Sequence, residues 1–203
     1  MSKSVVIVST GTANTASVVA AFRRAGATPK LADDAKDVEA GDRVVVPGVG
    51  SFGAAMSRID QVGMREVLSE RIDEGRPTLA ICLGLHLLCS ASEESPGQLG
   101  LDLVPETVTR FDDEVRVPQL GWNMVEPERG SRFLTRGWAY FANSYRLSRI
   151  PQGWTGATSD YGGRFVSALE RGDVLACQFH PELSGAWGAG ILERWLTVTS
   201  GVA

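Results

Sequence analysis

Short apolar runs rich in β-branched residues recur through the first half of the chain, with helical patterns between them. They cover residues 4–9 (SVVIVS), 43–46 (RVVV) and 77–81 (PTLAI), and a shorter strand is expected near residues 29–31. Continuous apolar strands of this kind are covered on both faces in folded proteins. A strand–helix–strand rhythm therefore predicts an α/β fold, with a mainly parallel central sheet and helices on both faces. In such sheets, ligands bind at the carboxyl ends of the strands.

Glycines mark the ends of the helices predicted in this half. The earlier helix is capped by Asn14 or Thr15 and stops at Gly26, and the later one stops at Gly75. Between these helices lies the turn 47–53 (PGVGSFG), which contains three glycines. Because glycine tolerates unusual backbone angles, this turn can approach a ligand closely.

From about residue 93 onward, the pattern changes to strands without long helices between them. Predicted strands lie at residues 106–111, 124–125, 140–145, 165–169 and 174–179. The segment 170–173 (ERGD) is typical of a hairpin turn, so we expect mostly antiparallel strands packed on the first half. An amphipathic helix containing Ile191 and Trp195 closes the chain. No linker interrupts the sequence, which predicts a single domain over residues 1–203.

The composition excludes several classes of function. A net charge of -4 argues against nucleic-acid binding and against docking on an anionic membrane surface. No apolar run reaches the roughly 18 residues of a membrane span, and the N-terminus lacks a signal-peptide cleavage site. The three cysteines form no Cys-x-x-Cys pair, which predicts a reducing, cytoplasmic location without disulfides or a metal site. The glycines form no dinucleotide fingerprint and no Walker lysine follows them, so we expect no cofactor.

Cys82 lies at the joint between the predicted strand 77–81 and an apolar segment with a helical pattern. Side chains at such joints stand clear of the sheet on a tight turn, and Gly84 leaves room for that turn. A thiol there faces the positive end of the following helix, which favours the thiolate. The alternative is a buried, inert core cysteine, which is the interpretation we give to Cys89 and Cys177.

The chain has only two histidines, so few residues can act as a base. His180 is followed by Pro181, which favours an extended backbone, and by Glu182, whose carboxylate can orient the imidazole. The alternative is a histidine satisfied by local hydrogen bonds. His86 is a rival base, one helical turn beyond Cys82. Residues 93–94, both glutamates, are interpreted as a solvated loop pair.

Several segments resemble the class I (triad) glutamine amidotransferases. They are residues 47–50 (PGVG), 81–84 (ICLG), 121–123 (GWN) and 178–182 (QFHPE), in that order. Together with residues 140–145 (YFANSY), they resemble more narrowly the glutaminase subunits of imidazole glycerol phosphate synthase, an enzyme of histidine biosynthesis. The resemblance implies a flavodoxin-like fold and hydrolysis of the glutamine side-chain amide. It also implies transfer of the ammonia to a (β/α)₈-barrel cyclase subunit.

The resemblance also assigns roles to particular residues. The implied catalytic triad is Cys82, His180 and Glu182. The implied oxyanion hole consists of Val49, Gly50 and Leu83. The implied glutamine-binding residues are His86, Asn143, Ser144 and Tyr145. The implied contacts to the cyclase are Trp122 and Asn123.

The chain departs from the family pattern at two of these positions. His86 stands where the family usually has glutamine, and Asn143 stands where it usually has histidine. Two alternatives therefore accompany the main hypothesis: a paralogous glutaminase that serves a different synthase, and a non-catalytic regulatory subunit on the same fold.

Overall fold

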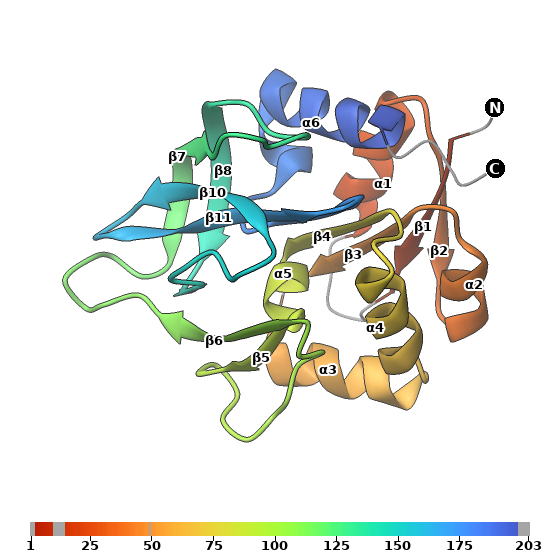
Figure 1. The fold of residues 1–203 in the computed structure, drawn as a ribbon, viewed down its shortest axis with the longest axis horizontal. Helices are drawn as coiled ribbons and strands as arrows, with labels where there is room; N and C mark the ends of the chain where they lie inside the picture. The colour runs from red at the N-terminus through yellow and green to blue at the C-terminus, as the bar shows by residue number, and fades with distance from the viewer. Residues whose placement is uncertain (1–2, 10–14, 49, 199–203) are drawn as a thin grey trace.

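Figure 1 shows the computed structural model of the chain, which describes residues 3–9, 15–48 and 50–198. A nine-stranded sheet crosses the molecule in the order β2-β1-β3-β4-β12-β11-β10-β7-β8. Five neighbouring strands are parallel: β1 (Ser4–Val8), β2 (Thr28–Ala32), β3 (Val44–Gly48), β4 (Thr78–Cys82) and β12 (Val174–Cys177). Every residue of β3, β4 and β12 is buried, which agrees with the apolar sequences of these strands. The predicted α/β fold with a parallel central sheet is confirmed.

Helices cover both faces of the parallel strands. In Figure 1, α1 (Thr15–Arg24) and α6 (Gly185–Val198) lie on one side of the sheet. On the other side lie α2 (Ala35–Ala40), α3 (Phe52–Gln61) and α4 (Arg65–Asp73). Phe22 of α1 and Trp195 of α6 pack edge to face, with ring centroids 6.0 Å apart. The helix α5 (Leu83–Leu87) is short and begins directly after Cys82.

The second half of the chain extends the same sheet. The strands β7 (Gln119–Pro127), β8 (Gly137–Asn143), β10 (Thr155–Asp160) and β11 (Arg164–Arg171) are antiparallel, and β11 pairs with β12 through the predicted hairpin. The expectation that these strands pack on the first half was wrong, because β12 pairs with β4 and continues the sheet. A separate three-stranded sheet contains β5 (Cys89–Ser92), β6 (Val104–Arg110) and β9 (Tyr145–Arg146).

The sequence analysis missed α2, α3, β5 and β10. The start of α2 is set by Asp34, whose carboxylate accepts a hydrogen bond from the backbone N–H of Asp37 (2.9 Å). The helix α3 buries Phe52, Ala55, Met56 and Ile59 at helical spacing, a pattern that was overlooked. The strands β5 and β10 have few apolar residues, so their local patterns are weak. The strand β10, for example, reads TGATSD, and it is held by its pairing with β11.

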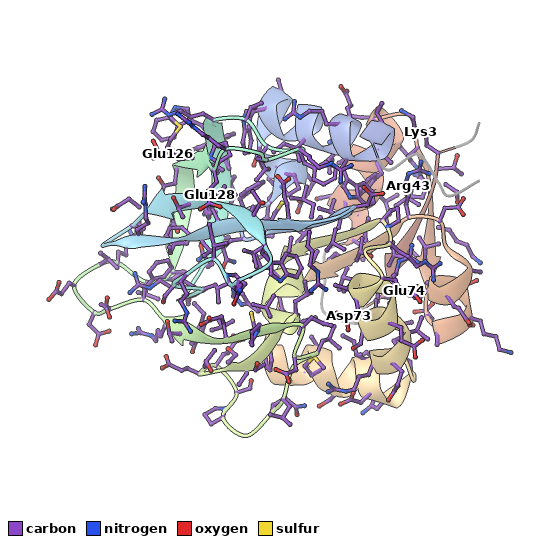
Figure 2. The ribbon with its side chains drawn as sticks, in the orientation of Figure 1. Lys3, Arg43, Asp73, Glu74, Glu126 and Glu128 are labelled. Atoms are coloured by element: carbon purple, nitrogen blue, oxygen red, sulfur yellow. The ribbon has the colours of Figure 1, made fainter. Side chains whose placement is uncertain are left out.

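Charged side chains link elements at the periphery of the fold. Figure 2 labels Asp73 and Glu74 at the end of α4, and Glu126 and Glu128 across the view by β7. Asp73 pairs with the guanidinium of Arg171 at 3.0 Å, which joins α4 to the β11–β12 hairpin. Among the described residues, no helix is long and apolar enough to cross a membrane.

Candidate active site

The sheet register brings three segments together at the carboxyl ends of the parallel strands. Gly48 at the end of β3 lies beside Cys82 at the end of β4, and Cys177 at the end of β12 lies beside Ile81. The turn after β3, the joint after β4 and the segment after β12 therefore meet at one edge, where ligands bind in such sheets. A crevice of about 180 Å³ opens there. Its lining residues are Gly50, Cys82, Leu83, His86, Glu94, Ala142, Asn143, Ser144, Tyr145 and His180.

Cys82 occupies a strained backbone conformation between β4 and α5. Its φ of 54° and ψ of -106° lie in a region that non-glycine residues rarely adopt. Such strain costs on the order of 1–3 kcal/mol and persists where the surroundings enforce it. Here the enforcement comes from close packing, because a Cβ on Gly84 would overlap the carbonyl oxygen of Val46. The tight turn predicted at Cys82 is therefore present, and it holds the thiol at the crevice.

His180 is fixed by its neighbours in the chain and by β8. Its backbone is extended (φ -100°, ψ 96°), as the following proline predicts. Its N–H donates to the carbonyl of Tyr140 (2.9 Å), and the hydroxyl of Ser184 donates to its carbonyl (2.6 Å). The ring Nδ1 lies 2.9 Å from Oε1 of Glu182, and both side chains are more than nine-tenths buried. The nitrogen Nε2 is thus left for Cys82.

The environment of His180 favours its protonated form. Burial works to lower the pKa of His180, but hydrogen bonds to Cys82 and Glu182, together with the negative charges of these groups, outweigh burial and raise it to about 10. The imidazole is therefore cationic at neutral pH. The three side chains form a sulfur–imidazole–carboxylate arrangement, the kind used for nucleophilic catalysis.

The rival base His86 has a different environment. Its Nε2 lies 2.7 Å from Oε1 of Gln178, an uncharged amide. Burial lowers the pKa of His86 to about 4, against a smaller opposing effect of the hydrogen bond to Gln178. His86 is therefore neutral at physiological pH. The amide nitrogen of Gln178 lies 3.8 Å from Sγ of Cys82, so a chain of side chains links His86 to the sulfur.

Two of the three residues predicted for the oxyanion hole lie in the part of the chain that the structure describes. Gly50 and Leu83 both line the crevice, and Gly50 has a positive φ of 104° that suits glycine. Val49 lies outside the described residues. The helix α3, which follows this turn, is capped from a distant loop: Glu94 accepts from the N–H of Phe52 (2.8 Å). This loop therefore helps to fix the end of the glycine turn.

Glu94 was missed as a site residue. The expectation of a solvated pair was wrong for it, because Glu94 is half-buried, lines the crevice and caps α3. Nothing local in the sequence separates it from Glu93, which is exposed and accepts from the N–H of Arg110. Gln178 was also missed, although its place two residues before His180 on an extended segment could have indicated a shared side of the chain.

The predicted glutamine-binding residues gather on the crevice. Asn143, Ser144 and Tyr145 line one wall, and His86 lines the same cavity. The amide nitrogen of Asn143 donates to the carbonyl of Tyr145 (3.0 Å). Its Oδ1 is buried and has no hydrogen-bond partner among the described residues. The site thus has an unused acceptor. In the described part of the chain, no group of three or more His, Cys, Asp or Glu side chains could hold a metal ion.

The two residues predicted to contact a partner lie on opposite faces of β7. The indole of Trp122 is 54% exposed, on a face of β7 and β8 that also carries Leu120, Trp138 and Tyr140. We call these four residues the apolar face. Asn123 points the other way, and its amide donates to the carbonyl of Asp160 (2.8 Å).

Comparison with known proteins identifies the family of the chain. The family model described as glutamine amidotransferase class-I matches residues 6–197. The chain therefore belongs to the class I glutamine amidotransferase family. It resembles a crystal structure titled "glutamine amidotransferase" with a TM-score of 0.78 and 22% identity, over 98% of this chain and 99% of that one. That likeness shows a shared fold.

Curated relatives narrow the assignment within the family. "Imidazole glycerol phosphate synthase subunit HisH" of Symbiobacterium thermophilum is 38% identical, over 94% of this chain and 92% of that protein. "Imidazole glycerol phosphate synthase hisHF, chloroplastic" of Arabidopsis thaliana is 40% identical, over 92% of this chain and 33% of that longer protein. Within the class I amidotransferases, the chain thus belongs with the HisH subunits.

Proposed function

We propose that this chain hydrolyses the side-chain amide of glutamine and supplies the ammonia to imidazole glycerol phosphate synthase in histidine biosynthesis. The observation that carries the proposal is the arrangement of three side chains: Cys82 and His180 line one crevice, and Glu182 holds Nδ1 of His180 at 2.9 Å. The full-length similarity to HisH subunits supports the same reaction.

The reaction begins with attack of the Cys82 thiolate on the amide carbon of glutamine. The imidazolium of His180 gives its proton to the departing nitrogen, so ammonia leaves and a glutamyl thioester remains. The neutral imidazole then takes a proton from water, which attacks the thioester and releases glutamate. Glu182 keeps Nδ1 protonated and orients the ring throughout both steps.

The tetrahedral intermediates carry a negative oxygen that needs backbone donors. The N–H of Leu83, directly after the nucleophile, is one proposed donor, and the turn containing Val49 and Gly50 is the proposed source of the other. Loss of one such donor costs about 2.7–4 kcal/mol in other hydrolases. The capping of α3 by Glu94 at the end of this turn supports the proposed geometry.

The crevice suits a small zwitterion. Its volume of about 180 Å³ is below the range for drug-sized ligands. The carboxylate of Glu94 can pair with the ammonium group of glutamine. On the other side, Asn143, Ser144 and Tyr145 line the cavity as predicted for substrate binding, and Oδ1 of Asn143 offers a free acceptor. His86 completes the predicted set of substrate-binding residues.

The proposed partner is the cyclase subunit of the synthase, which docks on the apolar face. Three of the residues on this face, Leu120, Trp122 and Trp138, are each more than half exposed. Ala142, paired with Leu120 across β7 and β8, also lines the crevice. Docking there would bring a partner next to the point where ammonia forms, so ammonia would pass directly between subunits. This chain matches one third of a longer plant protein named imidazole glycerol phosphate synthase hisHF. That match supports the proposal that the glutaminase acts together with the rest of the synthase.

Three further expectations stay with this proposal. Three free, buried cysteines suit a reducing compartment, so we place the protein in the cytoplasm. The match over residues 6–197 supports the view that residues 1–203 form a single amidotransferase domain. Asn123 stays a predicted contact, but with its amide bonded to Asp160 it would support Trp122 from the opposite face of β7.

Release of glutamate from glutamine tests the proposed function. We expect low activity for the chain alone, strong stimulation by the cyclase from the same organism, and no activity for Cys82→Ala. The matched control is Cys89→Ala, which removes a buried thiol outside the crevice and keeps activity. Activity that persists in Cys82→Ala would overturn the nucleophile assignment, and a failure of the cyclase to stimulate the wild type would favour a different synthase.

A further inference from the structure

We propose that His86 is a positioning residue that acts through Gln178, holding its amide N–H toward the sulfur of Cys82. The inference rests on the proposed function, because it concerns the same nucleophile. It adds a role for Gln178, and it gives His86 a task besides contact with glutamine.

The three side chains form a continuous link within the protein interior. Nε2 of His86 lies 2.7 Å from Oε1 of Gln178, and Nε2 of Gln178 lies 3.8 Å from Sγ of Cys82. Gln178 is fully buried, and His86 is 5% exposed. The backbone N–H of Gln178 donates to the carbonyl of Ser167 (2.9 Å), which anchors the residue to β11. The backbone of Gln178 is thus fixed in place. What remains to be set is whether the oxygen or the nitrogen of its side-chain amide faces Cys82.

His86 sets that orientation through its tautomer, since a proton on Nε2 requires an acceptor opposite it. A glutamine amide can turn over and exchange its oxygen and nitrogen at almost no steric cost. If the oxygen faced Cys82, it would repel a thiolate. With the oxygen facing His86, the histidine must donate from Nε2, and in a neutral ring this requires the Nε2–H tautomer. Burial lowers the pKa of His86 to about 4, which keeps the ring in a neutral form at physiological pH.

A neutral donor complements the charged groups around the nucleophile. Four titratable groups besides His86 lie near the sulfur: His180, Glu182, Glu94 and Tyr145. His180 supplies a positive charge, but its proton is consumed when ammonia leaves. The amide of Gln178 has no proton to lose, so its hydrogen bond to the sulfur persists through the cycle. Hydrogen bonds to charged groups are stronger than those between neutral groups.

The test measures alkylation of Cys82 by iodoacetamide as a function of pH, with no glutamine present. Only the thiolate reacts, so the midpoint of the pH curve reports its stability. For His86→Leu we expect the midpoint to rise by about one pH unit, equivalent to about a tenfold loss of reactivity below it. For His86→Gln we expect the wild-type midpoint, because its amide can donate to Oε1 of Gln178. Gln178→Glu, which removes the donor and adds a charge, should raise the midpoint further.

Cys89→Ala is the matched control, since Cys89 lies three residues beyond His86 and its buried thiol faces the carbonyl of Leu85. Its alkylation curve at Cys82 should equal that of the wild type. An unchanged midpoint in His86→Leu would overturn the proposal, and so would a raised midpoint that His86→Gln fails to restore. NMR of the wild-type imidazole nitrogens gives a readout without any variant. The Nε2–H tautomer at His86 between pH 6 and 8 is the expected result, and the Nδ1–H tautomer would overturn the proposal.

Turnover measured with the cyclase separates this inference from the proposed function. If His86 acts through Gln178, His86→Leu lowers kcat in step with the loss of thiolate. A rise in KM alone would leave His86 as a substrate contact and overturn the positioning role. If the wild type releases no glutamate even with the cyclase, the proposed function fails, whereas a shifted alkylation midpoint would still support the link from His86 to Cys82.

Discussion

His86 and His180, the two histidines of the chain, line the same crevice as Cys82, and their pKa values are shifted in opposite directions. Burial lowers the pKa of His86 to about 4. Burial also acts against protonation of His180, but hydrogen bonds and charges from Cys82 and Glu182 raise its pKa to about 10. The difference follows from their partners, since His86 faces an amide and His180 bonds to the carboxylate of Glu182 and to Cys82. One ring is therefore suited to proton transfer and the other to a fixed, neutral hydrogen bond.

Replacement of Glu182 tests the role of the carboxylate. In Glu182→Gln, the ring of His180 loses the negative charge beside Nδ1, so its pKa falls. The amide can also turn its NH2 group toward the ring, so the tautomer is no longer fixed by an acceptor-only partner. We expect glutamate release with the cyclase to fall by roughly 10²- to 10⁴-fold, the usual contribution of acid–base catalysis. The control is Glu193→Gln, which makes the same change on the exposed surface of α6. Equal activity in the two variants would contradict the proposed triad.

The lowered pKa of His86 predicts a loss of stability in acid. The unfolded chain binds a proton at His86 below pH 6.5, whereas the folded chain resists protonation until about pH 4. Stability therefore decreases as the pH falls through this window, by up to about 3 kcal/mol from this residue. Urea unfolding of wild type and His86→Gln at several pH values measures the free energy of unfolding of each. The carboxylates are common to both proteins, so their contributions cancel in the difference. We expect a shallower decline in the variant, and parallel curves would refute the assignment.

The sequence predicted the parallel part of the fold well, because its strands are continuous apolar runs. β3, β4 and β12 are buried on both faces, and their β-branched residues and flanking glycines identify them locally. In contrast, α3 was missed although Ser51 caps it locally and its buried residues recur at helical spacing; only its tertiary contacts were beyond prediction. Its first amides bond to Glu94 and Ser95, 42 residues away in the sequence, and no local pattern contains that information.

The candidate site also contains one part that could be predicted from local sequence and one part that depends on long-range contacts. The segment from His180 to Glu182 could be interpreted locally, because proline stiffens a turn that places the carboxylate near the ring. The contact between His86 and Gln178 spans 92 residues, and the two come together only because β12 lies beside β4. Sequence reasoning could nominate His86 as a rival base, but its neutral state depends on burial that the sequence does not reveal.

Gly84→Ala is expected to damage both stability and activity. The added Cβ would overlap the carbonyl oxygen of Val46 and push α5 away from β3, which relaxes the strained turn at Cys82. Overpacking of this kind costs about 1–3 kcal/mol, and displacement of the thiol should lower glutaminase activity as well. Chemical denaturation and glutamate release measure the two effects.

A second glycine provides the control for this experiment. Gly190 lies within α6, where a Cβ would meet only the end of the Arg194 side chain at 3.5 Å. We expect Gly190→Ala to raise stability slightly, since glycine is unfavourable inside a helix. If Gly84→Ala lowers the free energy of unfolding by no more than Gly190→Ala changes it, close packing does not enforce the turn at Cys82.

The apolar face predicts where the partner binds. Trp122 and Trp138 present large exposed rings on neighbouring strands, and aromatic residues of this kind dominate binding energies at interfaces. We expect Trp122→Ala and Trp138→Ala each to weaken binding of the cyclase by about 30-fold, which corresponds to about 2 kcal/mol. Titration calorimetry measures the affinity directly. Leu31→Ala is the matched control, because Leu31 is an exposed apolar residue on β2, at the opposite edge of the sheet. If Leu31→Ala weakens binding as much as the tryptophan variants do, the partner docks elsewhere, and ammonia must take a different route out of the crevice.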